Sequence, residues 1–326
     1  MSVTAVRESS ARIPRWALVL FALGMVVLLL APAVVVLVLR EPVVIADGQR
    51  LSAGHQPTDV AVEGSTVWVV SGRDDRVVAL DGRDASQDAV AHAAGASPLR
   101  LAVGAGSVWT ANAADDSVTR LDPLIPGSGR RIGIGTTAVD IAVSREGAWV
   151  TNGLAGTVTR IDPVSNRVLG TPVRTGSFPA ALAVGAGSVW VVNAGDGTVA
   201  RIDPREDVVI GRRIPVGRDP QDIAVGHGSV WVANRGDGSV TRLSAQTGRP
   251  QGTIPVGQAP GALAITADGV LVLDTRDGQL TAIDPRTSVT RRLTRIEGFP
   301  TSLAVGVGSA WVVDARSGTV VRVQPR

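Results

Sequence analysis

The feature that most constrains this chain is a unit of about 40 residues that recurs seven times. A tryptophan marks six of the copies, and a leucine replaces it in the sixth copy along the chain. A fixed period of this length restricts the chain to architectures in which repeated supersecondary units pack against their neighbours. The marker positions are Trp68, Trp109, Trp149, Trp190, Trp231, Leu271 and Trp311, with successive spacings of 41, 40, 41, 41, 40 and 40 residues.

Each unit has the composition of four short strands. In the fifth copy, runs rich in Val, Ile, Thr and Trp cover 222–225, 229–233, 239–243 and 251–256, and Gly, Asp, Asn and Pro separate them. We name these runs strands A, B, C and D of a unit. No run has helical periodicity. Four antiparallel strands repeated seven times predict an all-β fold, a seven-bladed β-propeller.

Strand A of every unit carries an alanine at one register. Blades converge toward the axis of a propeller, so a methyl group fits there, whereas a larger side chain would cost roughly 1–3 kcal/mol. The tryptophan of strand B is expected farther out, where the space between blades widens and a large ring fills it. The alanines are Ala61, Ala102, Ala142, Ala183, Ala224, Ala264 and Ala304.

The two ends of the repeat region complement each other. The last copy ends after strand C, at Arg326, and the segment "GQRLSAG" from Gly48 aligns with "GRRIPVG" from Gly211, which belongs to a strand D. The N-terminal segment is therefore predicted to supply the missing outer strand and close the ring over residues 48–326. Closure removes the unpaired strand edges that an open array would expose.

The sequence Arg235-Gly236-Asp237 matches a cell-adhesion tripeptide, but it falls in the turn between strands B and C. Sister turns read "NAGDGT", "NAADDS", "NGLAGT" and "DARSGT". Their shared elements are an Asx residue and, after two or three spacer residues, an Asp or Gly, which supply side-chain caps and positive-φ positions for a tight turn. We interpret the tripeptide as a turn.

A run of 23 uncharged residues, 17–39, precedes the repeats and is long enough to cross a bilayer. Arginines on its N-terminal side predict a cytoplasmic tail at 1–15, a transmembrane helix at 16–40, a linker at 41–47 and an extracytoplasmic propeller. The alternative is a signal peptide cleaved near Ala31-Pro32-Ala33, followed by secretion. The start of the closing strand is expected on the face of the A–B and C–D loops, so the D–A and B–C loops should point away from the membrane.

The charge balance argues against a nucleic-acid partner. Residues 1–40 hold four of the 32 basic residues and one of the 29 acidic residues, which leaves 28 of each in the exterior part. A region without net charge exerts no net attraction on phosphate backbones. The chain has no cysteine, which excludes disulfides and attachment of a lipid through cysteine.

Candidate ligand-binding residues stand two positions before each strand A alanine, where the strand opens into the central funnel. Unlike the alanines, these residues vary between copies, which indicates a ring that could bind a polar or cationic ligand, or one cation. In the alternative interpretation each polar residue pairs with a neighbouring blade's backbone or with an arginine. The polar ring members are Asp59, Arg100, Asp140, Asp222 and Ser302, with Gln221 beside the ring and His55 at the mouth.

No catalytic or cofactor motif accompanies this ring. His55 has no second His or Glu at ligand spacing, and no Gly-rich phosphate loop, nucleophile elbow or HExxH sequence occurs. We predict no cofactor, and a divalent cation at the three aspartates is the alternative. A separate row of arginines at the end of strand C is expected to form a solvated outer face with local ion pairs: Arg120, Arg160, Arg201 and Arg242.

The repeated "AVGxGSVWVxNxxDGxVxRIDP" resembles the YVTN-type propeller repeat of YncE-like extracytoplasmic proteins and the repeats of streptogramin B lyases. The resemblance covers about 48–326 and implies the propeller fold. The lyases use His and Glu residues with a magnesium ion in the funnel. Only His55, and less closely Glu297, stands near the mouth here. No catalytic residue is transferred to this chain.

Three hypotheses for the function follow. The first is a membrane-anchored extracytoplasmic module that binds a small molecule or protein on its membrane-distal face, as a sensor or scaffold. The second is a funnel-based lyase or hydrolase, a carbon-oxygen lyase by resemblance, that uses a divalent cation at Asp59, Asp140 or Asp222. The third is a structural module whose funnel is unused. The identity of the ligand or partner and the oligomeric state do not follow from the residues.

Overall fold

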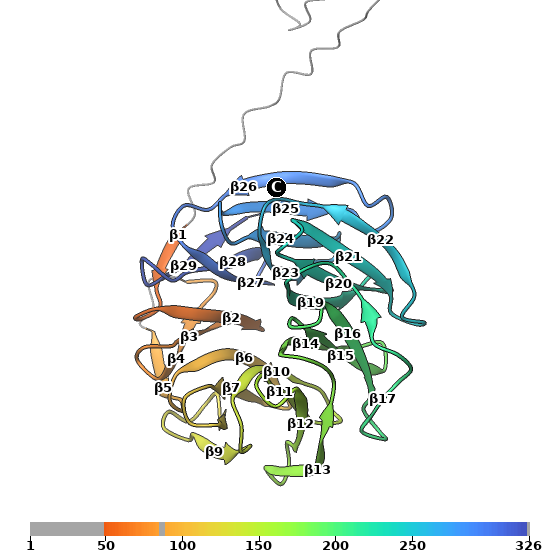
Figure 1. The fold of residues 1–326 in the computed structure, drawn as a ribbon. Helices are drawn as coiled ribbons and strands as arrows, with labels where there is room; N and C mark the ends of the chain where they lie inside the picture. Colours follow the sequence, from red (N-terminus) through yellow and green to blue (C-terminus); the bar gives the residue numbers. More distant parts are fainter. Residues whose placement is uncertain (1–48, 85–88, 325–326) are drawn as a thin grey trace, which may run out of the picture. The chain divides into compact units, whose positions relative to one another are not determined.

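The computed structural model describes residues 49–84 and 89–324, and within them the chain forms a seven-bladed β-propeller of antiparallel sheets (Figure 1). The predicted tail, membrane span and linker, at 1–15, 16–40 and 41–47, lie outside these residues. No helix in the described part of the chain has the length and apolar character needed to cross a bilayer.

Each of the first six blades consists of consecutive strands, the seventh is completed by β1, and strand A is innermost in every blade. The first three blades are β2 (Pro57–Glu63), β3 (Thr66–Ser71), β4 (Arg76–Asp81), β5 (Val90–Ala93); β6 (Pro98–Gly104), β7 (Ser107–Asn112), β8 (Ser117–Leu121), β9 (Arg130–Gly133); and β10 (Ala138–Val143), β11 (Ala148–Asn152), β12 (Thr157–Asp162), β13 (Arg167–Arg174). The next two are β14 (Pro179–Gly185), β15 (Ser188–Asn193), β16 (Thr198–Asp203), β17 (Val208–Val209), β18 (Ile214–Pro215); and β19 (Pro220–Gly226), β20 (Ser229–Asn234), β21 (Ser239–Ser244), β22 (Pro250–Pro255). The last two are β23 (Pro260–Ile265), β24 (Val270–Asp274), β25 (Gln279–Ile283), β26 (Thr290–Arg295); and β27 (Pro300–Gly306), β28 (Ser309–Asp314), β29 (Thr319–Val323), β1 (Gln49–Ser52).

The strands predicted for the fifth unit are all present, and each observed strand overlaps its predicted run. The fourth blade departs from the pattern because its strand D is split. Both halves, β17 and β18, pair with β16, and residues 210–213 separate them. This is the strand D whose sequence was aligned with the closing segment.

Ring closure by the N-terminal segment is confirmed. β1 pairs antiparallel with β29, with Gln49 opposite Arg322 and Ser52 opposite Thr319. Gln49 therefore lies beside the end of a strand C, on the face of the A–B and C–D loops. The described part of the chain begins on the face that the sequence predicts to meet the membrane.

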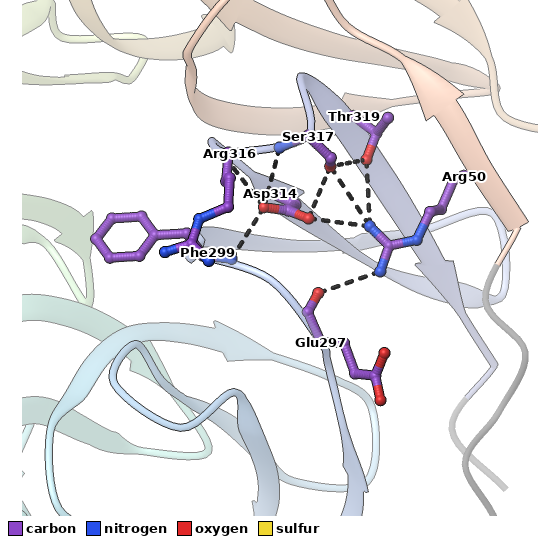
Figure 2. Close-up of polar contacts among 7 residues, drawn as sticks. All are labelled: Arg50, Glu297, Phe299, Asp314, Arg316, Ser317 and Thr319. Atoms are coloured by element: carbon purple, nitrogen blue, oxygen red, sulfur yellow. Dashed lines mark hydrogen bonds and ion pairs between the residues drawn. The ribbon is translucent and has the colours of Figure 1, made fainter.

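An ion pair and several hydrogen bonds hold the closing strand in place (Figure 2). The guanidinium of Arg50 on β1 donates through Nη1 to Asp314 Oδ2 at 2.9 Å and through Nη2 to the carbonyl of Glu297 at 3.1 Å. Asp314 is 2% exposed and also accepts a hydrogen bond from the backbone N–H of Phe299 at 2.9 Å. Arg50 thus joins β1 to two other segments of the last blade.

The tryptophans fill the space between blades, as predicted. Five of the six marker tryptophans are at most 1% exposed, and Trp68 is 3% exposed. Trp231 packs with Leu263, Val270 and Val272 of the following blade, and its register partner on strand A is Ala224. The same alanine–tryptophan pairing recurs at each tryptophan-bearing blade, so a small residue at the axis and a large one outside it define the wedge shape.

The expectation of a solvated arginine row was wrong. Arg242 is half-buried, and its guanidinium carbon lies 4.8 Å from the ring centroid of Trp231, directly across from it in the sheet. A guanidinium over an indole face gains a cation–π interaction that an isolated surface ion pair lacks. Corresponding stacks pair Arg120 with Trp109, Arg160 with Trp149, Arg201 with Trp190 and Arg322 with Trp311.

Candidate functional site

The predicted ring residues lie on the innermost strands, which surround the axis of the propeller (Figure 1). Each lies at a break in strand register near the start of strand A, such as the shift between Pro57 and Asp59. Strand A has no partner on its axial side, so the backbone N–H groups along that edge need other acceptors. The ring aspartates meet this need on three of the strands, at the backbone N–H groups of Leu101, Leu182 and Leu263.

Asp59 links three blades. Its Oδ1 accepts hydrogen bonds from Ser302 Oγ at 2.5 Å and from Arg100 Nη1 at 3.3 Å, and its Oδ2 accepts one from the backbone N–H of Leu101 at 2.9 Å. Ser302 belongs to the seventh blade and Arg100 to the second. The carboxylate therefore bridges the blade that closes the ring and the first two blades that follow.

The other two carboxylates repeat the backbone contact. Asp140 Oδ2 accepts from the N–H of Leu182 at 2.8 Å, and Asp222 Oδ2 accepts from the N–H of Leu263 at 2.7 Å. Aspartates on the first, third and fifth blades thus each cap the strand A edge of the next blade. The interpretation in which ring residues pair with a neighbouring backbone describes these contacts, and the ring also has capacity beyond them.

The charges of Asp59, Asp140 and Asp222 act on Arg100, and the charge of Arg100 acts on Asp140 and Asp222. Burial raises the pKa of Asp140 to about 7 and that of Asp222 to about 6, against the opposing attraction of Arg100. Burial alone would lower the pKa of Arg100, but the carboxylates of Asp59, Asp140 and Asp222 raise it overall. With all four groups ionised, the ring carries two negative charges in excess.

Several polar atoms of this ring make no hydrogen bond with any described residue. Arg100 uses only Nη1, so Nε and Nη2 remain as donors, and Asp140 uses only Oδ2. Asp140 is half-buried, whereas Asp59 is only 8% exposed. The ring can therefore offer a carboxylate acceptor and guanidinium donors to one ligand.

The three carboxylates of the ring are not arranged to coordinate a single divalent cation. Within residues 49–84 and 89–324, no group of three or more His, Asp or Glu side chains is placed to hold a metal ion. One oxygen of each ring carboxylate is engaged by a backbone N–H, and the positive charge of Arg100 lies among them. The arrangement suits a molecular ligand that spans the ring better than an ion that draws the carboxylates together.

Two further predicted residues lie beside the ring but outside its contacts. Gln221 Nε2 donates to Asp219 Oδ1 at 2.6 Å in the loop that leads into β19. His55 is exposed, and its Nδ1 lies 2.8 Å from Asp74 Oδ1 in the B–C turn of the same blade. Hydrogen bonds from the backbone N–H of His55 and from Ser71 lower the pKa of Asp74. His55 therefore helps to join the loop before β2 to the B–C turn of the same blade.

Two exposed aromatic residues at the mouth were not identified from the sequence. Phe178 and Phe299, the phenylalanines of the described chain, are 46% and 52% exposed and both precede the proline that begins strand A. The ring of Phe178 lies over Gly153, where an added Cβ would approach it to 3.3 Å. Figure 2 shows Phe299 directed away from the Asp314 contacts. The signal in the sequence was an aromatic residue in a loop position that elsewhere holds Gln, Ser, Thr, Asp or Ala.

The Arg-Gly-Asp stretch forms the B–C turn that the sequence predicts. Asp237 Oδ2 accepts the backbone N–H of Arg218 at 2.6 Å, and its Oδ1 lies 2.5 Å from Arg218 Nε. Gly238 has a φ of 62°, which favours glycine. The aspartate of the tripeptide is thus engaged in holding the D–A loop.

Comparison with known proteins shows the fold and no family. No family model matches the chain, and no curated protein matches it in sequence. Among solved structures, virginiamycin B lyase from Staphylococcus aureus aligns with a TM-score of 0.73 at 13% identity, over 84% of this chain and 97% of that one. Hydrazine synthase of Kuenenia stuttgartiensis aligns with a TM-score of 0.72 at 16% identity, over 86% and 97%. The Myceliophteria thermophila Cps50 (Swd1) propeller domain gives 0.70 at 12% identity, over 85% and 99%.

Proposed function

We propose that this protein is a membrane-anchored extracytoplasmic propeller, built from YVTN-type repeats, that binds a polar ligand carrying positive charge at its axial ring. The observation that carries the proposal is the grouping of Asp59, Asp140 and Asp222 around Arg100, with an excess of negative charge and unused hydrogen-bonding atoms. A cationic group would compensate the buried carboxylates, whose burial otherwise costs free energy.

Binding, rather than turnover, is favoured by the residue types in the ring. The alternative of a streptogramin B lyase-like enzyme calls for a group that takes or gives a proton at the reacting atom. The ring has none of the histidine or glutamate residues that those lyases use, and His55 is engaged with Asp74 at the rim. The groups of the ring that can exchange a proton are its aspartates, each of which has one oxygen engaged by the backbone N–H of a neighbouring blade. A sensor or scaffold that recognises a cationic ligand needs only the charges and hydrogen bonds that the ring offers.

The first test is calorimetric titration of the full-length protein in nanodiscs with n-butylammonium and n-butylguanidinium, and separately with Mg²⁺ and Ca²⁺. We expect saturable binding of an organic cation that weakens by about tenfold or more in the D140N/D222N variant, since the two removed charges together are worth roughly 1.4 kcal/mol or more at this site. Asparagine retains an oxygen that can accept from Leu182 or Leu263, so the fold should persist.

The matched control is Asp268→Asn, in the A–B turn between β23 and β24 on the opposite face. It removes one exposed carboxylate and should leave affinity unchanged. Equal binding by the wild type and the ring variant would contradict the proposal, as would the absence of binding by all four probes. Stoichiometric binding of a divalent ion alone would favour the enzyme alternative.

Binding of the organic cation should depend on pH. Because the pKa values of Asp140 and Asp222 lie at about 7 and about 6, both carboxyls are largely neutral at pH 5 and ionised at pH 8.5. We expect about a tenfold or greater gain in affinity between these pH values, with proton release on binding near pH 6.5. Titration in buffers of different ionisation enthalpy measures that release. An affinity that is constant from pH 5 to 8.5 would argue against these carboxyls as the binding groups.

A further inference from the structure

Apolar side chains project from three successive C–D turns on the face opposite the funnel mouth. Leu124 and Ile125 follow β8 and are 87% and 57% exposed, Val164 follows β12 and is 84% exposed, and Val208 at the start of β17 is 52% exposed. We call these four residues the C–D patch. They belong to the second, third and fourth blades.

Hydrogen bonds between blades hold the three turns next to one another. Arg120 Nη1, two residues before the turn of Leu124, donates to the carbonyl of Pro163 at 2.6 Å. Arg160 likewise pairs with Asp207, the neighbour of Val208, at 3.0 Å. Each arginine is itself stacked on the tryptophan of its own blade. The patch is therefore presented on fixed turns across three adjacent blades.

The turns themselves do not require apolar residues. Leu124 and Val164 follow an Asp-Pro pair whose aspartate accepts their backbone N–H, at 2.9 Å and 3.0 Å. Arg205 and Arg286 occupy the same position in the fourth and sixth blades, with the same hydrogen bond at 2.9 Å and 2.8 Å. A charged residue thus suits the turn, and apolar residues on adjacent blades expose hydrophobic surface that a partner can cover.

The position of β1 indicates what covers this patch. β1 begins at Gln49 on the face of the C–D turns, and about nine residues separate it from the apolar run 17–39. Such a linker spans at most roughly 30 Å when extended. We infer that the C–D patch inserts into the interfacial region of the lipid bilayer to which this run anchors the chain, an inference that rests on the proposed membrane anchor.

The tether through β1 and the seating of the C–D patch in the bilayer would complement each other. β1 belongs to the seventh blade, whereas the patch lies on the second to fourth blades, on the other side of the ring in blade order. A single tether allows the propeller to tilt, and apolar turns seated in the interface at a second point limit that tilt. The D–A and B–C loops, with Phe178, Phe299 and the ring mouth, would then face away from the membrane.

Because the chain has no cysteine, a single introduced cysteine can report the environment of one turn. The experiment places an NBD label on Val164→Cys in the full-length protein, reconstituted into phosphatidylcholine–phosphatidylglycerol vesicles. We expect blue-shifted emission and a loss of about half its intensity when doxyl-labelled lipids are included. The matched control is Leu154→Cys, an apolar residue 80% exposed in a B–C turn on the opposite face, which should show neither change.

Vesicle flotation, measured in parallel, separates this inference from the anchor on which it rests. Flotation of the protein with an unquenched, water-exposed label at Val164 would overturn the inference and leave the anchor standing. Failure of the protein to float would overturn the anchor and with it the inference. A blue shift that needs no lipid and grows with protein concentration would identify a second copy of the chain as the occupant. A Leu124→Glu/Val208→Glu background should reduce lipid quenching at position 164 while the protein still floats.

Discussion

Alanine in place of Trp231 is expected to lower the free energy of unfolding by about 3–5 kcal/mol, because it leaves a cavity where a large ring filled the space between two blades. The side chain is fully buried, and its Nε1 donates to the carbonyl of Gly226 at 3.1 Å. The change also removes the surface on which Arg242 stacks. Urea denaturation followed by far-ultraviolet circular dichroism measures the loss.

The sixth blade suggests a matched control for this prediction. Leu271 holds the equivalent place there, with Ala282 opposite it instead of an arginine. Trp231→Leu should therefore destabilise less than Trp231→Ala, and adding Arg242→Ala to Trp231→Leu should cost little more, since the stack is already lost. A loss below about 1 kcal/mol for Trp231→Ala would show that the ring does not fill the wedge in the way the burial indicates.

Asp314→Ala should be the second most damaging of these changes, at about 3 kcal/mol, because it removes the acceptor that ties the closing strand to its blade. Asp314 accepts from Arg50, from Ser317 Oγ at 2.7 Å and from the backbone N–H groups of Phe299 and Arg316 (Figure 2). Denaturation of the full-length protein measures the loss, and proteolysis near β1 should quicken if the ring opens there.

Asp274 provides the control that isolates the ion pair. It is the corresponding residue of the sixth blade and accepts four backbone N–H groups, including those of Gln258 at 2.6 Å and Ala259 at 2.8 Å, but no arginine. Asp314→Asn should therefore cost about 1 kcal/mol more than Asp274→Asn, since the Arg50 side chain is 41% exposed and partly screened. Equal costs would mean that Arg50 contributes no net stability.

The pH dependence of this closure has a definite sign. Burial by itself raises the pKa of Asp314, but hydrogen bonds from Ser317 and Phe299 and the contact with Arg50 lower it overall. A carboxyl whose pKa is lower in the folded state contributes stability above its unfolded pKa of about 3.9, and that contribution is lost as the pH falls through the folded value. The difference between the wild type and Asp314→Asn should accordingly shrink in acid.

Much of the architecture could be predicted from the repeat period, because nearly every blade packs the same residue types at the same strand positions. An alanine opposite a tryptophan in successive copies predicts both which strand is innermost and where the wedge widens, and the burial of Trp190 and Trp231 confirms it. Closure followed because a lone strand D sequence at one end matched a missing strand D at the other. The arginines near the end of strand C were misjudged because their partner, the indole on the neighbouring strand, is apparent only once Arg242 is placed opposite Trp231.

The ring was predictable only as a set of positions. Variation at one register marked Asp59, Arg100, Asp140, Asp222 and Ser302, but not the pairing of Asp59 with Ser302 across the closure. The raised pKa values of Asp140 and Asp222 depend on burial and on charges contributed by other blades. The exposure of Phe178 at the mouth depends on how its loop folds over Gly153.

By itself, the sequence determined the number of blades, the strands within each blade, the residue at each core register and the segment that closes the ring. These properties depend on contacts within a unit or between identical units, which a periodic pattern repeats and so reveals. Only the tertiary structure decided which side chains meet at the axis, which arginines stack on indoles and which apolar turns lie adjacent on the C–D face. The contacts of the axial ring and of the C–D turns join residues about 40 or more positions apart whose identities differ from blade to blade, so no period records them. The arginine–indole stacks join residues within one blade, such as Arg242 and Trp231, and they form only once strands B and C pair in register.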